Sequence, residues 1–381
     1  MIVAGVMSGT SADGINVAIV RLMGRAPNVR FSLLAEAQFE YPAAVRKAVL
    51  TAMNAGTASV ADLSRLNFVL GELYADAVLA TKRRHGVAKL ELIGCHGQTI
   101  YHQGDAAPFL GRKVAVTWQT GEGAVVAQRT GVPTVSDFRP ADMASGGKGA
   151  PLVPMLDYIV YRHRTRGRIL QNIGGIGNLT AIPAKAKLDD CVAFDTGPGN
   201  MVIDACMERL YGKRYDKDGR IAATGTVMSE IVFEFLKDAY FKRKPPKTAG
   251  REEYGREFVA RFLRRCGRAR KEDVIATATA LTAASIRQSV ESFVLPRGKF
   301  HDFVVAGGGS RNPTLMKSLQ EGLRPLGLRV RDSAEFGVPA ESKEAIAFAV
   351  LAYLTWNRRP GNVPSATGAK KAAILGKISY V

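Results

Sequence analysis

One local pattern recurs at three distant places in the sequence: an apolar run followed at once by a turn rich in glycine and small polar residues. Short apolar runs bounded by glycine indicate buried strands. Segments with helical periodicity separate or follow them, at 59–84 (with Ser59 as a candidate N-cap), 273–294 and 341–356. Strands that alternate with long helices predict an α/β fold, and the repeated turns predict two similar halves across a cleft. The three stretches are "MIVAGVMSGTSADG" (1–14), "ILQNIGGIGNLT" (169–180) and "FVVAGGGSRNP" (303–313).

Length and charge narrow the functional classes. At 381 residues the chain exceeds the usual size of one hydrophobic core, so two domains are expected. The formal net charge of +19 raises the question of nucleic-acid binding. The basic runs at 161–168, 241–251 and 264–271 lack interleaved aromatic residues, and no helix-turn-helix or zinc-finger pattern accompanies them. We therefore expect a solvated basic surface, helped by anionic substrates, and no nucleic-acid partner.

The sequence also predicts a cytoplasmic protein that does not enter a membrane. No apolar run approaches the roughly 20 residues that cross a bilayer, and the first residues lack the basic and apolar regions of a signal peptide. A C-x-x-C spacing is absent, which argues against a zinc site or disulfide framework and favours a reducing compartment. The four cysteines are Cys95, Cys191, Cys206 and Cys266.

The first glycine turn, in "GVMSGTSADGIN" (5–16), is a candidate phosphate site. Small residues after a strand let backbone N–H groups converge on phosphate oxygens. Thr10 and Ser11 add hydroxyl donors, and Asp13 is placed to hold Mg²⁺ or a substrate hydroxyl. The Walker pattern G-x-x-x-x-G-K-[ST] is absent from the sequence. A plain β-hairpin turning at "SADG" is the alternative, and the two interpretations are compatible.

The second and third turns suggest opposed binding loops. Gly174, Gly175 and Gly177 clear space after a strand, and Asn178 offers a donor. The triple glycine at 307–309 precedes a helix and is placed to pass beneath an adenine and ribose. A bulge or ordinary turn is the usual explanation of a single glycine-rich stretch. The hypothesis of phosphate loops therefore depends on their recurrence.

In "VAFDTGPGN" (192–200) an apolar run ends on a carboxylate and then bends through glycine and proline. Asp195 is a candidate catalytic base, metal ligand or helix N-cap. A carboxylate facing phosphate loops can accept a proton from a hydroxyl or from water. Aspartate is also a favoured N-cap, although Thr196 and Asn200 are placed to cap equally well. We favour the base and leave the other two interpretations open.

Three further side chains are candidates for the substrate or metal site. His96 and Gln98 lie at a strand end in "GCHGQT" (94–99), where the flanking glycines favour substrate hydrogen bonding over core packing. Glu344 lies near the start of a helix, and a surface acid in the first turn is the simpler interpretation of it.

Arg139 lies in the polar stretch "VSDFRPADMASGGKGAPLVP" (135–154). Its guanidinium can bind a carboxylate or phosphate with two parallel hydrogen bonds. An internal ion pair with Asp137 or Asp142 is the alternative.

Taken together, these motifs resemble the anhydro-N-acetylmuramic acid kinase family from end to end. Any one is modest evidence, but the ordered set is specific. The resemblance implies an actin-like, ribonuclease H-like α/β fold with two domains of shared topology around an ATP cleft, here 1–134 plus 357–381 and 135–356. The matching motifs are "GVMSGTSADGI", "CHGQTIYH", "VSDFRPADMASGGKGAPLVP", "NIGGIGNLT", "FDTGPGN", "PPKTAGRE", "AGGGSRNPTLM" and "PSATGA".

The resemblance also implies a reaction. The family opens the 1,6-anhydro ring of 1,6-anhydro-N-acetylmuramic acid with water and phosphorylates the freed 6-oxygen from ATP, a step of cell-wall sugar recycling. Asp195 is then the base that activates water, Asp13 and Arg139 support catalysis, and Asp13 and Glu344 hold Mg²⁺. His96, Gln98, Arg139, Asp195 and Glu344 line the sugar site. The implied ATP contacts are Gly9, Thr10, Ser11, Ala12, Asp13, Gly14, Ile15, Asn16, Gly174, Gly175, Asn178, Gly307, Gly308, Gly309 and Asn312.

This chain departs from the family pattern at three positions. Asn16 stands where an aspartate is usual, Lys148 where glutamine is frequent, and Asp157 where many members have histidine. Some of these features resemble kinases of levoglucosan, a neutral 1,6-anhydro sugar, so that substrate is the first alternative. An actin-like ATPase without sugar chemistry is the second. The expected partners are the sugar and ATP, and a homodimer is the expected assembly.

Overall fold

The computed structural model describes residues 1–381 except 10–11, 13, 26–27 and 54. The chain divides into two compact units, residues 1–160 with 341–381 and residues 161–340. The limits predicted from the sequence, after 134 and after 356, differ from these. Helix α14 (Lys343–Trp356) packs on strands β1 and β4 of the first unit, and α4 (Phe138–Ala144) packs on β5 of the same unit. Both segments therefore belong to the first unit.

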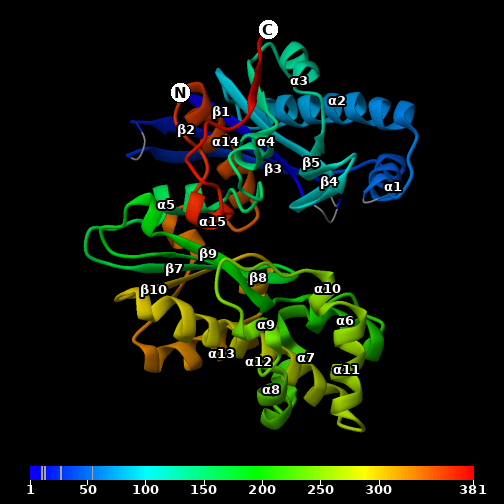
Figure 1. The fold of residues 1–381 in the computed structure, drawn as a ribbon, viewed down its shortest axis with the longest axis vertical. Helices are drawn as coiled ribbons and strands as arrows, with labels where there is room; N and C mark the ends of the chain where they lie inside the picture. The colour runs from blue at the N-terminus through cyan, green and yellow to red at the C-terminus, as the bar shows by residue number, and fades with distance from the viewer. Residues whose placement is uncertain (10–11, 13, 26–27, 54) are drawn as a thin grey trace. The chain divides into compact units, whose positions relative to one another are not determined.

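In the described part of the chain, the first unit is built on a seven-stranded sheet with the order β12-β6-β4-β1-β2-β3, in which β5 pairs with β4 (Figure 1). β1, β2 and β3 pair antiparallel in succession, whereas β4 lies parallel to β1 and β6 parallel to β4. The hairpin expected at the start of the chain is confirmed. The strands are β1 (Ile2–Ser8), β2 (Gly14–Met23), β3 (Arg30–Glu40), β4 (Leu92–Phe109), β5 (Arg112–Thr120), β6 (Thr134–Ser136) and β12 (Lys377–Ser379).

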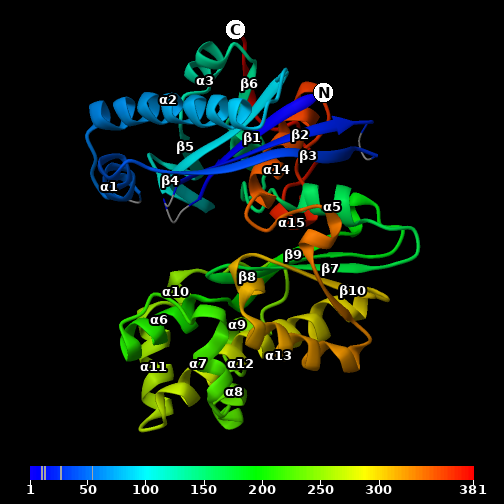
Figure 2. The same cartoon turned by 180° about the vertical axis from the view of Figure 1, so that it is seen from behind.

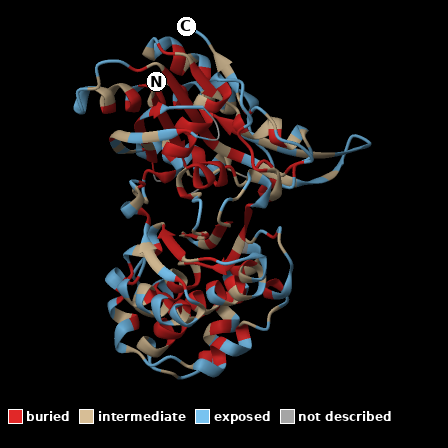
Figure 3. Cartoon of the chain, turned by 90° about the vertical axis from the view of Figure 1, so that its left-hand side faces the viewer, coloured by how far each residue is buried: buried red, intermediate tan, exposed pale blue. Residues whose placement is uncertain are grey.

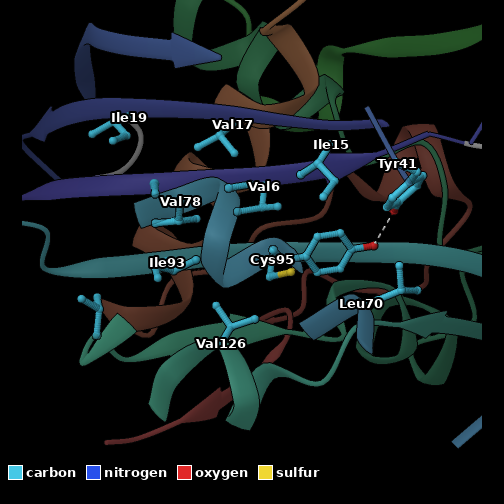
Figure 4. Close-up of a cluster of buried hydrophobic side chains, with 14 of the residues drawn as sticks. Val6, Ile15, Val17, Ile19, Tyr41, Leu70, Val78, Ile93, Cys95 and Val126 are labelled. Carbon is cyan, nitrogen blue, oxygen red and sulfur yellow. Dashed lines mark hydrogen bonds between the residues drawn. The ribbon is translucent and has the colours of Figure 1, made fainter. Parts of the chain in front are cut away.

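Side chains of successive residues point to opposite faces of this sheet, and helices pack on both faces. Ala4, Val6 and Cys95 belong to a buried cluster shared with α2, shown in Figure 4. Gly5 and Gly94 point the other way, and a Cβ at either position would lie 1.7 or 2.2 Å from a carbonyl oxygen of α14. Only glycine allows this close approach. The helices of the first unit are α1 (Ala43–Ala52), α2 (Val60–Arg84, capped by Ser59 as predicted), α3 (Gly123–Thr130), α4, α5 (Pro154–Tyr161, which ends one residue past the limit), α14 and α15 (Pro364–Thr367).

The second unit repeats the pairing pattern of the first. Its five-stranded sheet, counted over the described residues, has the order β11-β10-β7-β8-β9. β7, β8 and β9 pair antiparallel in succession, β10 lies parallel to β7, and β11 lies parallel to β10. The same sequence of pairings joins β1, β2, β3, β4 and β6, so the predicted shared topology and the α/β class are confirmed. The strands are β7 (Arg168–Ile173), β8 (Ile176–Ile182), β9 (Val192–Pro198), β10 (Asp302–Ala306) and β11 (Arg329–Asp332).

Helices α12 and α13 cover one face of the second sheet (Figure 2) and share a buried cluster with it. Buried residues concentrate in the strands and in the helices packed on them within each unit (Figure 3). None of the helices in the described ranges is long and apolar enough to cross a membrane. The helices are α6 (Met201–Tyr211), α7 (Arg220–Thr224), α8 (Ser229–Phe235), α9 (Ala239–Lys242), α10 (Arg251–Tyr254), α11 (Arg256–Cys266), α12 (Lys271–Ser289) and α13 (Pro313–Leu323).

One predicted strand end is wrong. The sequence predicted that a strand ends at "GCHG", but β4 continues through it to Phe109 and pairs with β5. Gly97 has φ +78°, and the register of β4 shifts on both sides of it, against β1 and against β5. The irregularity keeps His96 and Gln98 inside a continuous strand, and glycine is needed for it because φ is positive.

Candidate functional site

The predicted site residues are distributed over both units. Thr10, Ser11 and Asp13 lie outside the described residues. The first unit contains Gly9, Ala12, Gly14, Ile15, Asn16, His96, Gln98, Arg139 and Glu344; the second contains Gly174, Gly175, Asn178, Asp195, Gly307, Gly308, Gly309 and Asn312.

Asp195 lies in β9 and is hydrogen-bonded to the backbone of a neighbouring segment, residues 247–249. Its Oδ2 accepts a hydrogen bond of 2.8 Å from the Ala249 N–H, and its own N–H donates to the Lys247 carbonyl at 3.0 Å. The Tyr240 hydroxyl donates to the Asp195 carbonyl at 2.7 Å. Helix α6 begins only at Met201. Asp195 therefore does not cap that helix, and its carboxylate is oriented by the fold.

The environment of Asp195 favours its protonated form. Burial raises the pKa of this half-buried carboxyl to about 6, the Ala249 N–H opposes the rise, Glu253 adds to it, and Lys247 lowers the pKa. A carboxylate with a pKa near 6 is ionised at neutral pH and is a better proton acceptor than an ordinary aspartate. The position thus has both the geometry and the basicity of a general base.

The second and third glycine turns lie beside each other at the ends of β7 and β10, which are parallel neighbours. A Cβ on Gly307 would lie 2.5 Å from the Asn172 Oδ1, and one on Gly309 would lie 2.4 Å from the Ile173 Cγ2. The third turn therefore packs directly against the end of β7. In open α/β sheets ligands bind outside the carboxyl ends of the strands, which is where both turns lie.

The second turn is also tied to the segment that follows Asp195. The carbonyl of Gly174 accepts the Asn200 N–H at 2.7 Å, and that of Gly175 accepts the Gly199 N–H at 2.9 Å. A Cβ on Gly174 or Gly175 would meet its nearest atom at 3.7 or 3.5 Å, an ordinary van der Waals contact, and Gly175 is exposed. The bend "TGPGN" thus holds the glycine turn beside Asp195.

The two predicted asparagine ligands of this unit differ in their surroundings. Asn178 pairs with Asp195 across β8 and β9, so its backbone lies directly opposite the proposed base. Asn312 caps α13, and its Oδ1 accepts the Leu315 N–H at 3.0 Å. The side-chain oxygen of Asn312 is therefore used by the helix.

In the first unit, Gln98 braces the first glycine turn. Its side chain is fully buried; Oε1 accepts the Ser8 hydroxyl at 2.7 Å, and Nε2 donates to the Gly9 carbonyl at 3.1 Å. The Ala12 N–H donates to the same Gly9 carbonyl at 3.1 Å, and Gly14 begins β2. Both ends of the Gln98 amide are thus engaged in shaping the turn.

His96 and Arg139 form a buried pair. The His96 Nδ1 lies 2.7 Å from the Gly97 carbonyl oxygen, which can only accept, so Nδ1 carries the proton. The unprotonated Nε2 accepts the Arg139 Nε–H at 3.0 Å, and the Arg139 Nη1 donates to the Gly149 carbonyl at 2.9 Å. Asp137 pairs with Lys377 at 3.1 Å. Arg139 is therefore held by a neutral histidine and a carbonyl.

Burial is the largest influence on the pKa values of both Arg139 and His96. Desolvation lowers the pKa of Arg139 to about 10, and Glu344 opposes that change. Surrounding protein atoms raise the pKa of Glu344, against the lowering effects of Arg139 and Lys343, although water still reaches its side chain. Phe348, one turn after Glu344 on α14, packs against His96 with ring centroids 4.5 Å apart and the ring planes tilted by 42°. One helix thus presents a carboxylate and an aromatic ring toward the same pair.

We expect His96 to be neutral at physiological pH. Burial and then Arg139 lower its pKa well below the ordinary value, so His96 contributes stability above about pH 6.5 that is lost as the pH falls below it. Titration of the ring nitrogens by ¹⁵N NMR tests this, with the exposed His85 as the comparison in the same spectrum. A His96 signal with a midpoint near pH 6.5 would contradict it.

Asp142, which the sequence offered as an ion-pair partner of Arg139, has a structural role instead. It is fully buried and accepts hydrogen bonds from the Gly149 N–H at 2.8 Å, and from Asn362 and Thr367 at 2.7 Å each. It joins the stretch around Arg139 to the "PSATGA" stretch and so fixes the Gly149 carbonyl that binds Arg139. The joint presence of the two motifs was the only sequence signal for this contact.

The family model for anhydro-N-acetylmuramic acid kinase matches residues 1–381. A kinase of that description from Caldanaerobacter subterraneus subsp. tengcongensis is 45% identical, over 99% of this chain and 96% of its own length. One from Bacillus cereus is 42% identical, over 100% and 99%. Among solved structures, the activator of 2-hydroxyisocaproyl-CoA dehydratase from Clostridium difficile with bound ADPNP is 11% identical with a TM-score of 0.45, covering 94% of this chain and 96% of that one. A likeness that weak carries no argument about activity.

Proposed function

The chain belongs to the anhydro-N-acetylmuramic acid kinase family, and from that premise we propose how its residues divide the reaction. The chain is a sugar kinase that opens the 1,6-anhydro ring of 1,6-anhydro-N-acetylmuramic acid with water. The freed 6-oxygen is phosphorylated, and the product is N-acetylmuramic acid 6-phosphate.

Asp195 acts as the general base. The observation that carries this role is the oriented, half-buried carboxylate with its pKa raised to about 6. Asp195 accepts a proton from the water that attacks the anomeric carbon, and the bond from that carbon to the 6-oxygen breaks. The freed 6-oxygen then forms its bond to phosphorus. A positioned base contributes roughly 10²–10⁴-fold to such a step.

When bound, ATP with Mg²⁺ supplies the γ-phosphoryl group that the 6-oxygen accepts. The turn at Gly174 and Gly175 suits a phosphate chain, because Gly175 is exposed and glycines carry no side chain that would cover the backbone N–H groups. Gly307 to Gly309 lie beside that turn and suit the nucleoside. Residues 9–16 of the first unit are the remaining phosphate contacts.

The donors present also suit a magnesium ion bound mainly through phosphate. Among the described residues, no three His, Cys, Asp or Glu side chains cluster as a metal site. Mg²⁺ is usually held by one or two carboxylates together with substrate phosphates and water. Glu344 supplies a water-accessible carboxylate in the described residues, and Asp13 is the second proposed ligand.

His96, Arg139 and Glu344 form the proposed sugar site of the first unit, together with Gln98 through its hold on the first turn. Arg139 is a half-buried cation fixed through Nε and Nη1, and we assign its Nη2 edge to the lactyl carboxylate of the sugar. Levoglucosan has no carboxylate, so this contact favours the muropeptide sugar over the neutral one.

A product assay tests the function. The protein is incubated with Mg²⁺-ATP and either 1,6-anhydro-N-acetylmuramic acid or levoglucosan, in H₂¹⁸O. Mass spectrometry is expected to find the 6-phosphate of the first sugar, with ¹⁸O on its anomeric carbon and none in the phosphate. Lack of product from both sugars, or label in the phosphate, would contradict the proposal.

We also propose that the enzyme works in the cytoplasm as a homodimer. All four cysteines are free and buried, which suits a reducing compartment. The dimer is an expectation from the family.

A further inference from the structure

The stretch "PPKTAGRE" (245–252) has no part in the reaction as described, yet it runs beside the strand that carries Asp195. The Lys247 carbonyl accepts the Asp195 N–H at 3.0 Å, and the Ala249 N–H donates to the Asp195 Oδ2 at 2.8 Å. Two backbone groups, two residues apart, therefore fix both the main chain and the carboxylate of Asp195. Any displacement of this short segment would displace the carboxylate with it.

The side chain of Lys247 anchors that segment. The residue is only 6% exposed, and its Nζ donates to the Tyr240 carbonyl at 3.3 Å. The same Nζ lies 4.7 Å from the ring centroids of Tyr240 and Phe293 and 5.7 Å from that of Phe194. An ammonium held against aromatic faces is attracted by them, and the attraction is larger where water is excluded. The aromatic rings thus fix the position of the cation.

Burying the Lys247 ammonium among apolar side chains is unfavourable, so the presence of a charge at this position needs a reason. Desolvation lowers the pKa of Lys247 to about 8, with Arg243 adding to the change and Asp195 opposing it. Lys247 is therefore mainly protonated at neutral pH, beside the carboxylate that it helps to hold. Methionine would occupy similar space without that cost.

Two charged groups act on the Asp195 carboxylate in opposite directions. Lys247 lowers the pKa of Asp195, and Glu253 raises it. The Glu253 Oε2 accepts the Gly250 N–H at 2.9 Å, and its Oε1 lies 3.7 Å from the Arg243 Nη1. The ionisation of Tyr240 is disfavoured by burial and by Asp195, so Tyr240 is a neutral hydrogen-bond donor here.

We propose that Lys247 is a positioning residue for Asp195: its caged ammonium anchors the 247–249 backbone that holds the carboxylate, and its charge stabilises the ionised, proton-accepting form. This role rests on the proposed function of Asp195 as the base. It gives the "PPKTAGRE" stretch a task in catalysis without contact with the reacting atoms.

The pH dependence of kcat/KM tests the role of Lys247. In Lys247→Met the acidic side of the profile is expected to move to higher pH by about half a unit to one unit, because the carboxylate loses a favourable charge. In Glu253→Gln, where the amide oxygen can still accept the Gly250 N–H, that side is expected to move to lower pH. Lys247→Arg is expected to retain the wild-type midpoint because it keeps the charge.

Lys244→Met is the matched control, since it removes the same charge from an exposed lysine three residues away and should leave the profile unchanged. If Lys247→Met does not fold, Lys247→Gln, which also removes the charge, takes its place, and Glu253→Gln checks that the profile follows the Asp195 carboxyl. An unmoved midpoint in the charge-removing variant of Lys247, with Asp195→Asn inactive, would overturn the role of Lys247. An active Asp195→Asn would instead overturn the proposed function itself.

Discussion

Replacing Asp195 with asparagine is expected to lower turnover by roughly 10²–10⁴-fold while ATP still binds. Asparagine has nearly the same shape and retains an oxygen that can accept the Ala249 N–H, so the local fold should survive. It cannot take a proton from water, and the chemical step therefore loses its base. Turnover is measured by coupled ADP release, and ATP binding by calorimetry.

Asp189→Asn is the control for this substitution. Asp189 is exposed and precedes β9, so the same chemical change six residues away should leave turnover near the wild-type value. The wild-type enzyme should also lose activity as the pH falls through about 6, since only the ionised carboxylate accepts a proton. Near-normal turnover in Asp195→Asn would contradict the general-base role and leave Asp195 only as the acceptor that positions the Ala249 N–H.

The architecture was largely predictable because its signals are local. Ser59 before an apolar helical pattern predicted the start of α2, and its hydroxyl does accept the Asp62 N–H at 3.3 Å. Apolar runs that end in glycine likewise predicted β1, β7 and β10. These features depend on a few neighbouring residues, so periodicity and capping are sufficient to find them.

The domain limits were less predictable because they depend on distant contacts. Helix α14 joins the first unit through Gly5 and Gly94, which come about 340 and 250 residues earlier and let its backbone approach the sheet. Nothing in the helical pattern of 341–356 records which sheet it covers.

For the candidate site, the sequence pattern does not distinguish a side chain that binds a ligand from one that supports the fold. Gln98 and Asn312 follow glycine-rich turns, as ligand-binding amides often do, yet each is buried and bonded to backbone groups. An amide that braces a turn and one that faces a ligand have the same sequence pattern. The motif "PPKTAGRE" marked the segment around Lys247 but not the role of this lysine, because its partners Tyr240, Phe194 and Phe293 come from separate elements.

The second large effect concerns the stability of the first unit. The Lys343 Nζ lies 2.7 Å from the Asp157 Oδ1, and the two side chains are only 7% and 4% exposed. This pair joins α5 to α14. The chain leaves the first unit at the end of α5 and returns to it shortly before α14 begins. Neither side chain is well solvated, so each depends on the other for compensation of its charge.

Lys343→Met is therefore expected to destabilise the first unit by about 3–5 kcal/mol, because it leaves a buried carboxylate without its cation. The double variant Lys343→Met/Asp157→Leu should recover much of that loss, since it removes both charges and keeps apolar volume. Lys317→Met, which breaks an exposed pair with Glu321, should change stability by less than about 1 kcal/mol. Calorimetry gives the transition temperatures, and hydrogen exchange in α5 and α14 assigns the change to the first unit. If Lys343→Met unfolded at the same temperature as Lys317→Met, the buried pair would not stabilise the unit, and the packing of α14 on Gly5 and Gly94 would account for its position.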